Sequence, residues 1–305
     1  MASHAGDLPL AAPSDRRRRG LARFGRAFVR QPVALGAGVV LVTLFLIGLI
    51  VPTLVPAGRA IHLTPDLFNR PPTLAGWHWF GTNSLGQDVL QQSIHGLHAT
   101  ELIAMLGTLL ATLAGVAIGG LAAYRGGWVD AALMRTTDAL GILPAIFIVL
   151  IFNFYATPVT TITQTMILAL CLWIPVARVV RAEVVGLRGR EFAQAAVALG
   201  ASDTRVFFRH LLPNASSTII IAGTSLFGQL LLLEATVEFL GLGESQLLTN
   251  PTLGSLIGYG KVQGLGMGWG WWTWSGPAFL LVLVLVCANL FGDGVAQALR
   301  PTARR

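Results

Sequence analysis

The segment EFAQAAVALGASDTRVFFRHLLPN, residues 191–214, predicts two short helices that meet at a glycine. Glu191 lies in the first turn of the first helix, where a carboxylate complements the positive end of the helix dipole. Gly200 is expected to end this helix, because glycine readily adopts the left-handed conformation. The apolar positions of the first helix follow the i, i+3, i+4, i+7 spacing of one face: Phe192, Ala195, Ala196 and Leu199.

The second half of the segment predicts a helix that leads into a hydrophobic run. Ser202 or Asp203 can cap its start. Arg205 and Arg209 share one face of this helix, and Pro213 lies where the next apolar run opens. The segment is therefore a helix–glycine–helix elbow. Two interpretations remain open: the elbow lies on the membrane surface, or it docks into a groove of a partner protein. A face of two alanines and a phenylalanine suits close contact better than membrane anchoring.

The rest of the chain has the composition of an all-α polytopic membrane protein. Of its 305 residues, 54% are hydrophobic and 11% are charged, and the mean hydropathy is +0.68. Soluble domains contain about 25% charged residues. Several apolar runs reach the roughly 20 residues that cross a bilayer core.

Six transmembrane helices are expected from these runs. They cover residues 33–55, 99–122, 136–156, 160–180, 215–239 and 276–298. The remaining segments are a basic tail (1–32), two outer loops (56–98 and 240–275), a long inner loop (181–214) and a C-terminal segment (299–305).

The distribution of Lys and Arg predicts the orientation of the spans. Six spans place both termini on one side. If that side is the cytoplasm, eighteen basic residues lie in inner segments and only Arg59, Arg70 and Lys261 lie in outer ones. This asymmetry is typical of multi-pass proteins of a bacterial-type cell membrane. It also accounts for the net charge of +7 without a nucleic-acid partner.

Polar residues in the fifth span are candidates for a translocation path, because ionisable groups inside a membrane are costly and usually functional. These candidates are Ser225, Gln229, Glu234 and Glu238. The two glutamates lie one helical turn apart near the outer end, so they face the path, line its mouth or pair with another subunit. Asp138 is expected to form an ion pair with Arg135 one turn before it.

No enzymatic site is expected in this chain. A nucleotide-binding P-loop requires GxxxxGK followed by Ser or Thr. The only Gly-Lys pair, Gly260-Lys261, is followed by a valine. His95 and His98 are spaced for a metal, but exposed interfacial histidines are the preferred interpretation. We therefore expect no catalytic residue, no metal and no cofactor in the chain itself.

The elbow resembles the EAA loop of ABC importer permeases, which has a glutamate, then alanines, a glycine and a later Leu-Pro. The matching positions are Glu191, Ala195, Ala196, Gly200, Leu212 and Pro213. Other stretches look like the C-type subunit of dipeptide and oligopeptide permeases: WFGTNSLGQDVL (79–90), YRGGWVDAALMRTTDALGILP (124–144), RHLLPN (209–214), EATVEFLGLGE (234–244) and NLFGDGVAQALRP (289–301). The resemblance covers nearly the whole chain after the tail.

The resemblance implies a type I ABC importer transmembrane domain with a permease core at residues 99–298. It implies a homologous second permease subunit, two cytoplasmic ATP-binding subunits that hold ATP and Mg, and an extracytoplasmic peptide-binding protein. The elbow would be the coupling helix. The residues assigned to ATPase coupling are Glu191, Phe192, Ala195, Ala196, Leu199, Gly200, Arg205, Arg209 and Pro213.

Departures from the family pattern leave the substrate open. Asn83 and Gln87 stand where the family usually has Asp and Arg, and Glu238 stands where a small polar residue is common. Short peptides are the expected substrate, with nickel, glutathione or another small solute as the near alternative. A secondary transporter would show broken spans in paired repeats with acids at the midplane, and no repeat is evident in the sequence.

Overall fold

The computed structural model describes residues 25–54, 65–74, 78–155, 159–243, 250–267 and 270–299. Most of the predicted basic tail and the C-terminal segment from residue 300 lie outside these ranges. Every regular element within them is a helix, and one isolated bridge joins Thr82 and Asp88.

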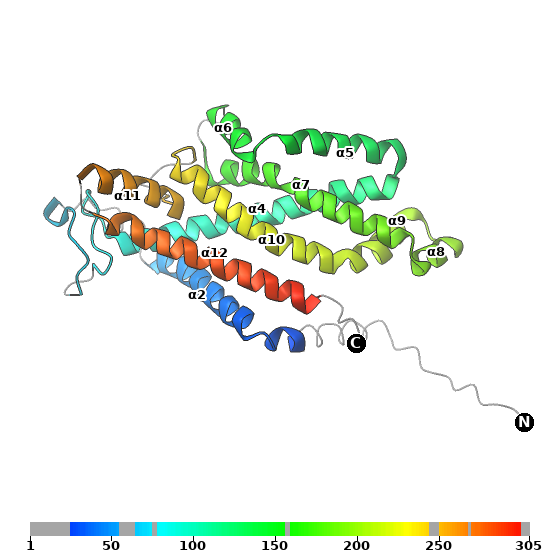
Figure 1. Cartoon of the computed structure of the whole chain (residues 1–305), viewed down its shortest axis with the longest axis horizontal. Coiled ribbons are helices and arrows are strands. Elements are labelled where there is room, and N and C mark those ends of the chain that lie inside the picture. Colours follow the sequence, from blue (N-terminus) through cyan, green and yellow to red (C-terminus); the bar gives the residue numbers. More distant parts are fainter. Residues whose placement is uncertain are drawn as a thin grey trace, which may run out of the picture.

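Five long helices run roughly along one axis (Figure 1). They are α2 (Pro32–Leu54), α4 (Val89–Arg125), α7 (Thr161–Arg188), α10 (Leu212–Phe239) and α12 (Trp272–Leu299). Each belongs to a helix that is long and apolar enough to cross a membrane, and a bent pair, α5 and α6, makes a sixth span if counted as one. The prediction of an all-helical, multi-pass membrane protein is confirmed.

The third span is a broken helix, contrary to the single helix predicted at 136–156. α5 (Gly127–Ile142) and α6 (Ala145–Tyr155) meet at an angle of 85°. The break falls at Pro144, since a proline disfavours the helical conformation of the residue before it. Leu143 accordingly has an extended backbone, with φ −75° and ψ 126°.

Two other helices extend beyond their predicted ends. α4 begins at Val89 instead of residue 99, because Asp88 caps it by accepting a hydrogen bond from Gln91 N. Its first ten residues include glutamines and histidines, so their hydropathy is low. The face around Gly96 is nevertheless buried against Thr252 and Leu253. α7 continues to Arg188, eight residues into the predicted inner loop.

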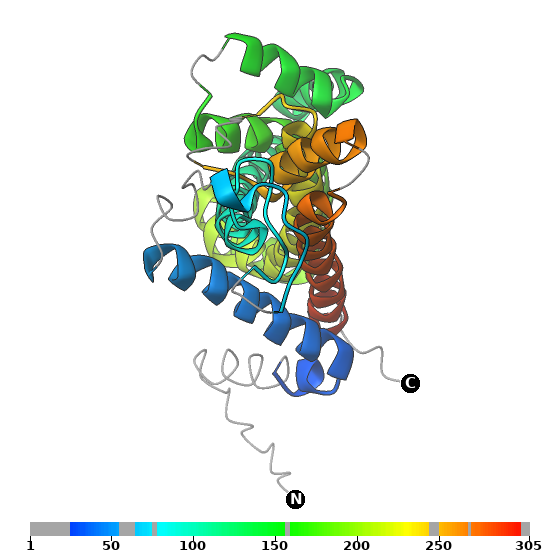
Figure 2. The ribbon, with the colours of Figure 1, turned by 90° about the vertical axis from the view of Figure 1, so that its left-hand side faces the viewer.

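The outer loops contain helices that the sequence did not predict. The short η1 (Pro65–Leu67) lies in the first loop, and α11 (Leu253–Met267) occupies much of the second. α11 packs against α12, α10 and α4. Figure 2 looks onto this end of the bundle, where α11 and the segment around residues 78–88 lie together. We call it the α11 end, and the opposite end, which carries residues 191–206, the elbow end.

Close contact between α4 and α7 forms the centre of the fold. Ala111, Gly115 and Gly119 follow an i, i+4, i+8 spacing on α4, and small residues at this spacing let membrane helices approach closely. A side chain at Gly119 would run into the backbone of Ala177. Val176, Val180 and other α7 residues complete a buried apolar cluster that continues to the elbow: Val184, Ala193, Val206 and Leu211.

Candidate docking elbow and polar groove

The elbow begins with α8 (Glu191–Ala198), which starts where predicted and ends two residues before Gly200. Gly200 has a φ of +81°, the left-handed conformation that favours glycine. Its N–H donates to Val197 O at 2.9 Å, and the N–H of Ala201 donates to Ala196 O at 3.0 Å. These two bonds form a Schellman motif, which satisfies the free carbonyls at the end of the helix.

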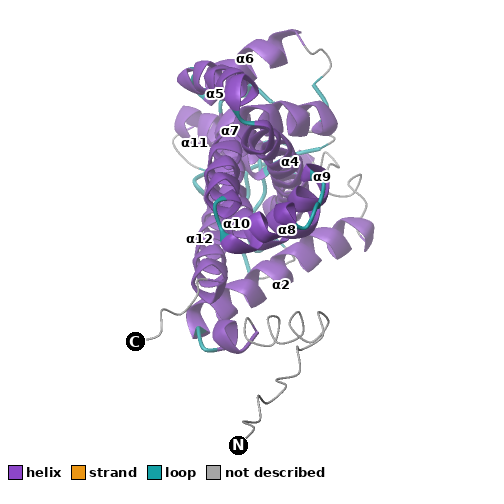
Figure 3. Ribbon diagram, turned by 90° about the vertical axis from the view of Figure 1, so that its right-hand side faces the viewer, coloured by secondary structure: helices purple, strands orange, loops and turns teal. Residues whose placement is uncertain are grey.

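The second part of the elbow is a helix that leads into the fifth span, as predicted, and it joins that span directly. α9 (Asp203–Val206), the π-helical turn η2 (Phe207–Leu211) and α10 follow one another without a gap. Pro213 lies just after the π-helical turn η2 and does not interrupt the helix, although its lack of an N–H removes one backbone hydrogen bond there. The elbow is thus α8 joined through Gly200 to one continuous helix that is long and apolar enough to cross a membrane. Figure 3 looks onto this end of the bundle, where α8 and α9 lie.

Several contacts fix the elbow to the bundle. The Arg188 guanidinium donates to the carbonyls of Ala123 (2.7 Å) and Tyr124 (3.2 Å) at the end of α4. The rings of Tyr124 and Phe207 lie 5.7 Å apart. Ala193 of α8 is 2% exposed and belongs to the central apolar cluster. α8 itself is therefore attached through Ala193, and its neighbours in the chain, the end of α7 and η2, are attached to α4.

Two ion pairs hold α5 against α7 near the same end. Arg181 donates two hydrogen bonds to Asp130, at 2.5 and 2.6 Å. Arg178 donates one to Asp138 at 3.0 Å. Asp138 was expected to pair with Arg135 on its own helix, so this prediction is wrong. Its partner comes from the next span, which the sequence spacing could not indicate.

The predicted apolar face of α8 is largely uncovered. Leu199 is 88% exposed and Phe192 is 39% exposed, while Glu191 and Ala195 are also exposed. Ala196 is half-buried against the bundle. The residues that attach α8 and those that remain free therefore lie on different sides of the same short helix. Exposed apolar groups on a well-anchored helix are typical of a docking surface.

Arg205 and Arg209 do not belong to α8. Both lie on the continuous helix after Gly200, and both are exposed. Their neighbours Thr204 and Phe208 line a groove against α4. The structure therefore separates these two arginines from the face formed by Phe192, Ala195 and Leu199.

A groove with an apolar lining and three polar residues runs between α7 and α10. Its volume is about 320 Å³, and Thr218, Ser225 and Gln229 supply its polar groups. Pro175 and Val179 contribute from α7. Ser225 and Gln229 are exposed, as residues beside a hydrated path would be.

Glu234 and Glu238 lie elsewhere, inside the bundle. Glu234 is 0% exposed and Glu238 is 2% exposed. The Glu234 carboxyl faces Thr100 of α4 and Thr252, the residue before α11. Leu253 N donates to Thr100 Oγ1 at 3.0 Å, so the start of α11 is attached to the same place. The sequence signal that was missed is TLGS (252–255), in which Thr252 and Ser255 cap the helix reciprocally.

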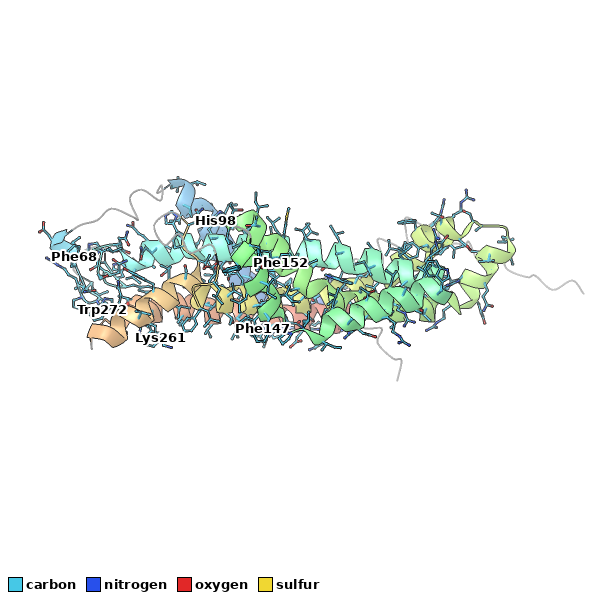
Figure 4. All side chains as sticks on the ribbon, turned by 90° about the horizontal axis from the view of Figure 1, so that it is seen from above. Phe68, His98, Phe147, Phe152, Lys261 and Trp272 are labelled. Carbon is cyan, nitrogen blue, oxygen red and sulfur yellow. The ribbon has the colours of Figure 1, made fainter. Side chains whose placement is uncertain are left out.

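Two of the positions that depart from the family pattern, Asn83 and Gln87, form an amide cluster with Gln92 at the α11 end. Asn83 Nδ2 donates to Gln87 Oε1 at 2.9 Å, and Gln92 Nε2 donates to the same oxygen at 2.6 Å. Beside them, His78 Nδ1 lies 2.7 Å from Asp88 Oδ2. Trp272 Nε1 donates to Thr82 O at 3.1 Å and joins this segment to α12. Figure 4 labels Phe68, Lys261 and Trp272 at this end.

Comparison with known proteins identifies the relatives of this chain. Residues 115–305 match the model of the binding-protein-dependent transport system inner membrane component family. The oligopeptide transport system permease protein OppC of Mycobacterium tuberculosis is 35% identical over 92% of this chain and 94% of its own length. The glutathione transport system permease protein GsiD of Pectobacterium atrosepticum is 29% identical over 91% of this chain and 90% of its own length.

A solved structure has the same fold. A chain of the MetNI methionine ABC transporter, in an inward-facing conformation, aligns with a TM-score of 0.57 and 18% identity, and the match covers 70% of this chain and 98% of that one. The fold is therefore that of a type I ABC importer permease. Since the family model covers more than half of the sequence and the OppC relative more than nine-tenths of it, this chain belongs to the binding-protein-dependent transport system inner membrane component family.

Proposed function

We propose that this chain is the permease subunit of an ATP-driven importer of short peptides in a bacterial-type cell membrane, with both termini in the cytoplasm. A homologous permease subunit would complete the path. Two cytoplasmic subunits would bind ATP and Mg and hydrolyse the nucleotide, and an extracytoplasmic binding protein would deliver the peptide. The observation that carries the proposal is the uncovered apolar face of α8 on a helix that is anchored on its other side.

The coupling role follows from this arrangement. Phe192, Ala195 and Leu199 would enter a cleft of the ATP-binding subunit. Glu191 begins the helix and Gly200 turns the chain back. The small side chain of Ala196 allows α8 to pack closely against its neighbours. When ATP closes the two ATP-binding subunits, α8 would move with them, and the contacts of Arg188 and Ala193 would pass the motion to the spans.

The α7–α10 groove is the proposed part of the path in this subunit. Ser225 and Gln229 can donate to and accept from the backbone of any peptide, so they suit a transporter that tolerates many side chains. The two glutamates play a different part in this proposal. Because Glu234 and Glu238 are buried against α11, they support the path by holding that helix, and do not contact the substrate while α11 stays in place.

Peptides are preferred over other solutes because several relatives carry that name, including OppC of Bacillus subtilis, 29% identical over 71% of this chain. Glutathione is the second candidate, supported by the similarity to GsiD. Both are compatible with the groove, since glutathione is itself a small peptide.

Co-purification tests the coupling role directly. The full-length chain, tagged and isolated from its own membrane, should bring a second permease and ATP-binding subunits with it. The double variant Phe192→Ser/Leu199→Ser should keep the second permease and lose the ATP-binding subunits. Truncating anchor residues of an interface typically costs about 2 kcal/mol or more each, so a large loss is expected. ATP-binding subunits retained at the normal level would contradict the proposal.

Substrate class is measured separately. The complete transporter in vesicles, with its binding protein and ATP, should take up labelled di- and tripeptides, and unlabelled peptide should compete. Uptake of glutathione alone would support the second candidate. Uptake that continues without ATP would contradict both.

A further inference from the structure

A second groove lies at the elbow end, between the last turns of α4 and the start of the continuous helix 203–239. Its volume is about 430 Å³, within the range of roughly 300–1,000 Å³ that is usual for small-ligand sites. Nearly all of its lining is apolar: Leu113, Val116, Ala117, Leu121, Phe208 and Leu212. Tyr124 and Thr204 form its polar end, where their hydroxyl groups lie 3.5 Å apart. We call it the arginine-rimmed groove.

Three arginines follow directly after lining residues of this groove. Arg125 follows Tyr124, Arg205 follows Thr204 and Arg209 follows Phe208. All three are exposed. Within the described part of the chain, none of them has a carboxylate or hydrogen-bond partner, and the ion pairs there use Arg178, Arg181 and His78. The arginines do not line the groove themselves, so unneutralised positive charge lies beside an apolar groove.

The position of the groove along the bundle matches one leaflet of a bilayer. α4 has 37 residues and is therefore about 55 Å long, which exceeds a hydrocarbon core of about 30 Å. The groove runs along twelve residues near its end, about 17 Å from Leu113 to Tyr124. Its apolar residues from Leu113 to Leu121 fall within the apolar run 99–122 that is expected to cross the membrane. Tyr124 and the arginines lie toward the helix end, where aromatic and basic residues meet the headgroups.

We propose that the arginine-rimmed groove binds an anionic phospholipid of the leaflet at the elbow end. One acyl chain would lie along Leu113, Ala117 and Leu121, and the phosphate would meet Arg205 and Arg209. Guanidinium groups bind phosphate oxygens through paired hydrogen bonds, and basic pockets between membrane helices are suited to acidic headgroups. A lipid held there would brace the helix that carries the elbow.

This assignment differs from the sequence-based prediction that Arg205 and Arg209 contact the ATP-binding subunits, and the two are separable. The complete transporter, with the subunits that co-purify with it, is incubated with equal amounts of phosphatidylglycerol and phosphatidylcholine, and bound lipid is counted by native mass spectrometry. The wild type should retain phosphatidylglycerol preferentially. Arg205→Gln/Arg209→Gln should weaken its binding by about fivefold per arginine.

Two further variants control the experiment. Ala117→Phe should also reduce phosphatidylglycerol binding, because it fills the groove while leaving both arginines in place. Arg30→Gln/Arg135→Gln removes the same charge at exposed positions that do not line the groove, and should bind lipid as the wild type does. Equal retention of both lipids by the wild type, or normal retention by the Arg205/Arg209 double variant, would overturn the proposal. Loss of the ATP-binding subunits from that double variant with unchanged lipid binding would also overturn it, and would return these arginines to the docking surface.

Discussion

The two ends of this bundle are built in opposite ways. At the α11 end, polar groups are buried and paired within the chain: the amides of Asn83, Gln87 and Gln92 bond to one another, and Trp272 reaches Thr82. At the elbow end, the chain leaves Leu199 exposed together with several unpaired arginines. The amides and the indole named at the α11 end are satisfied within the chain, whereas the exposed groups of the elbow end are available to a partner outside it.

Because of this difference, mutations at the α11 end should mainly change the stability of the subunit, and mutations at the elbow end should mainly change its association with partners. A buried, paired group contributes to the stability of the subunit, and its loss is measured by unfolding. An exposed apolar group on an anchored helix contributes little to the folded monomer, since water already contacts it, and its loss is measured by association. Variants that change stability and association equally would show that the two ends are not independent.

The largest effect on stability is expected from Trp272→Ala. The side chain is 7% exposed and its indole N–H donates to Thr82 O. Truncation of a buried tryptophan costs about 3–5 kcal/mol in soluble cores, so unfolding in detergent should occur at a clearly lower temperature. Co-purification of ATP-binding subunits, measured below that temperature, should not change.

Trp271→Ala is the matched control, because the neighbouring indole is 62% exposed. It should shift the unfolding temperature little. Equal destabilisation by the two variants would mean that burial at the α11 end does not distinguish them, and the contrast between the ends would lose its basis.

Much of this contrast could not be predicted from the sequence. Local signals located the elbow: the start of α8 at Glu191 and the reversal at Gly200 depend on residues within one helical turn. The burial of Glu234 depends on Thr100 and Thr252, which are distant in sequence. Hydropathy identifies a span, but it does not indicate which neighbouring helix covers each side.

The same reasoning explains the errors in the helix boundaries. Residues 89–98 are polar enough to resemble a loop, yet α11 covers them. The break at Pro144 had a local cause and was overlooked because the apolar run continues through it. Pro213 shows the opposite case, a proline that does not end a helix, and it lies just after the π-helical turn η2.

An intermediate effect is expected from Gly200→Ala at the elbow. The Cβ of an alanine at this position would meet no other atom within 4 Å, so only the positive φ opposes the substitution. The left-handed conformation costs an alanine about 1–2 kcal/mol. This cost should loosen the link between α8 and α10 and reduce peptide uptake severalfold, with normal insertion into the membrane. Gly186→Ala is the control: its Cβ also has open space, but it lies within α7 with no such φ, so uptake should be unchanged.

The smallest expected effect compares the two ion pairs between α5 and α7. Asp130 binds Arg181 through two short bonds and its side chain is 19% exposed, whereas Asp138 makes one 3.0 Å bond to Arg178 and is 62% exposed. Exposed pairs contribute about 0–1 kcal/mol, and a shielded, two-bond pair should lie at or slightly above the upper limit. Asp130→Asn should therefore lower the unfolding temperature by a few degrees and Asp138→Asn by less.

Because the Asp130 pair also fixes α5 beside the elbow, Asp130→Asn should reduce ATP-dependent uptake more than Asp138→Asn does. If Asp138→Asn reduced uptake more than Asp130→Asn does, the Asp138–Arg178 pair, which lies closer to α6, would be the contact that positions α5.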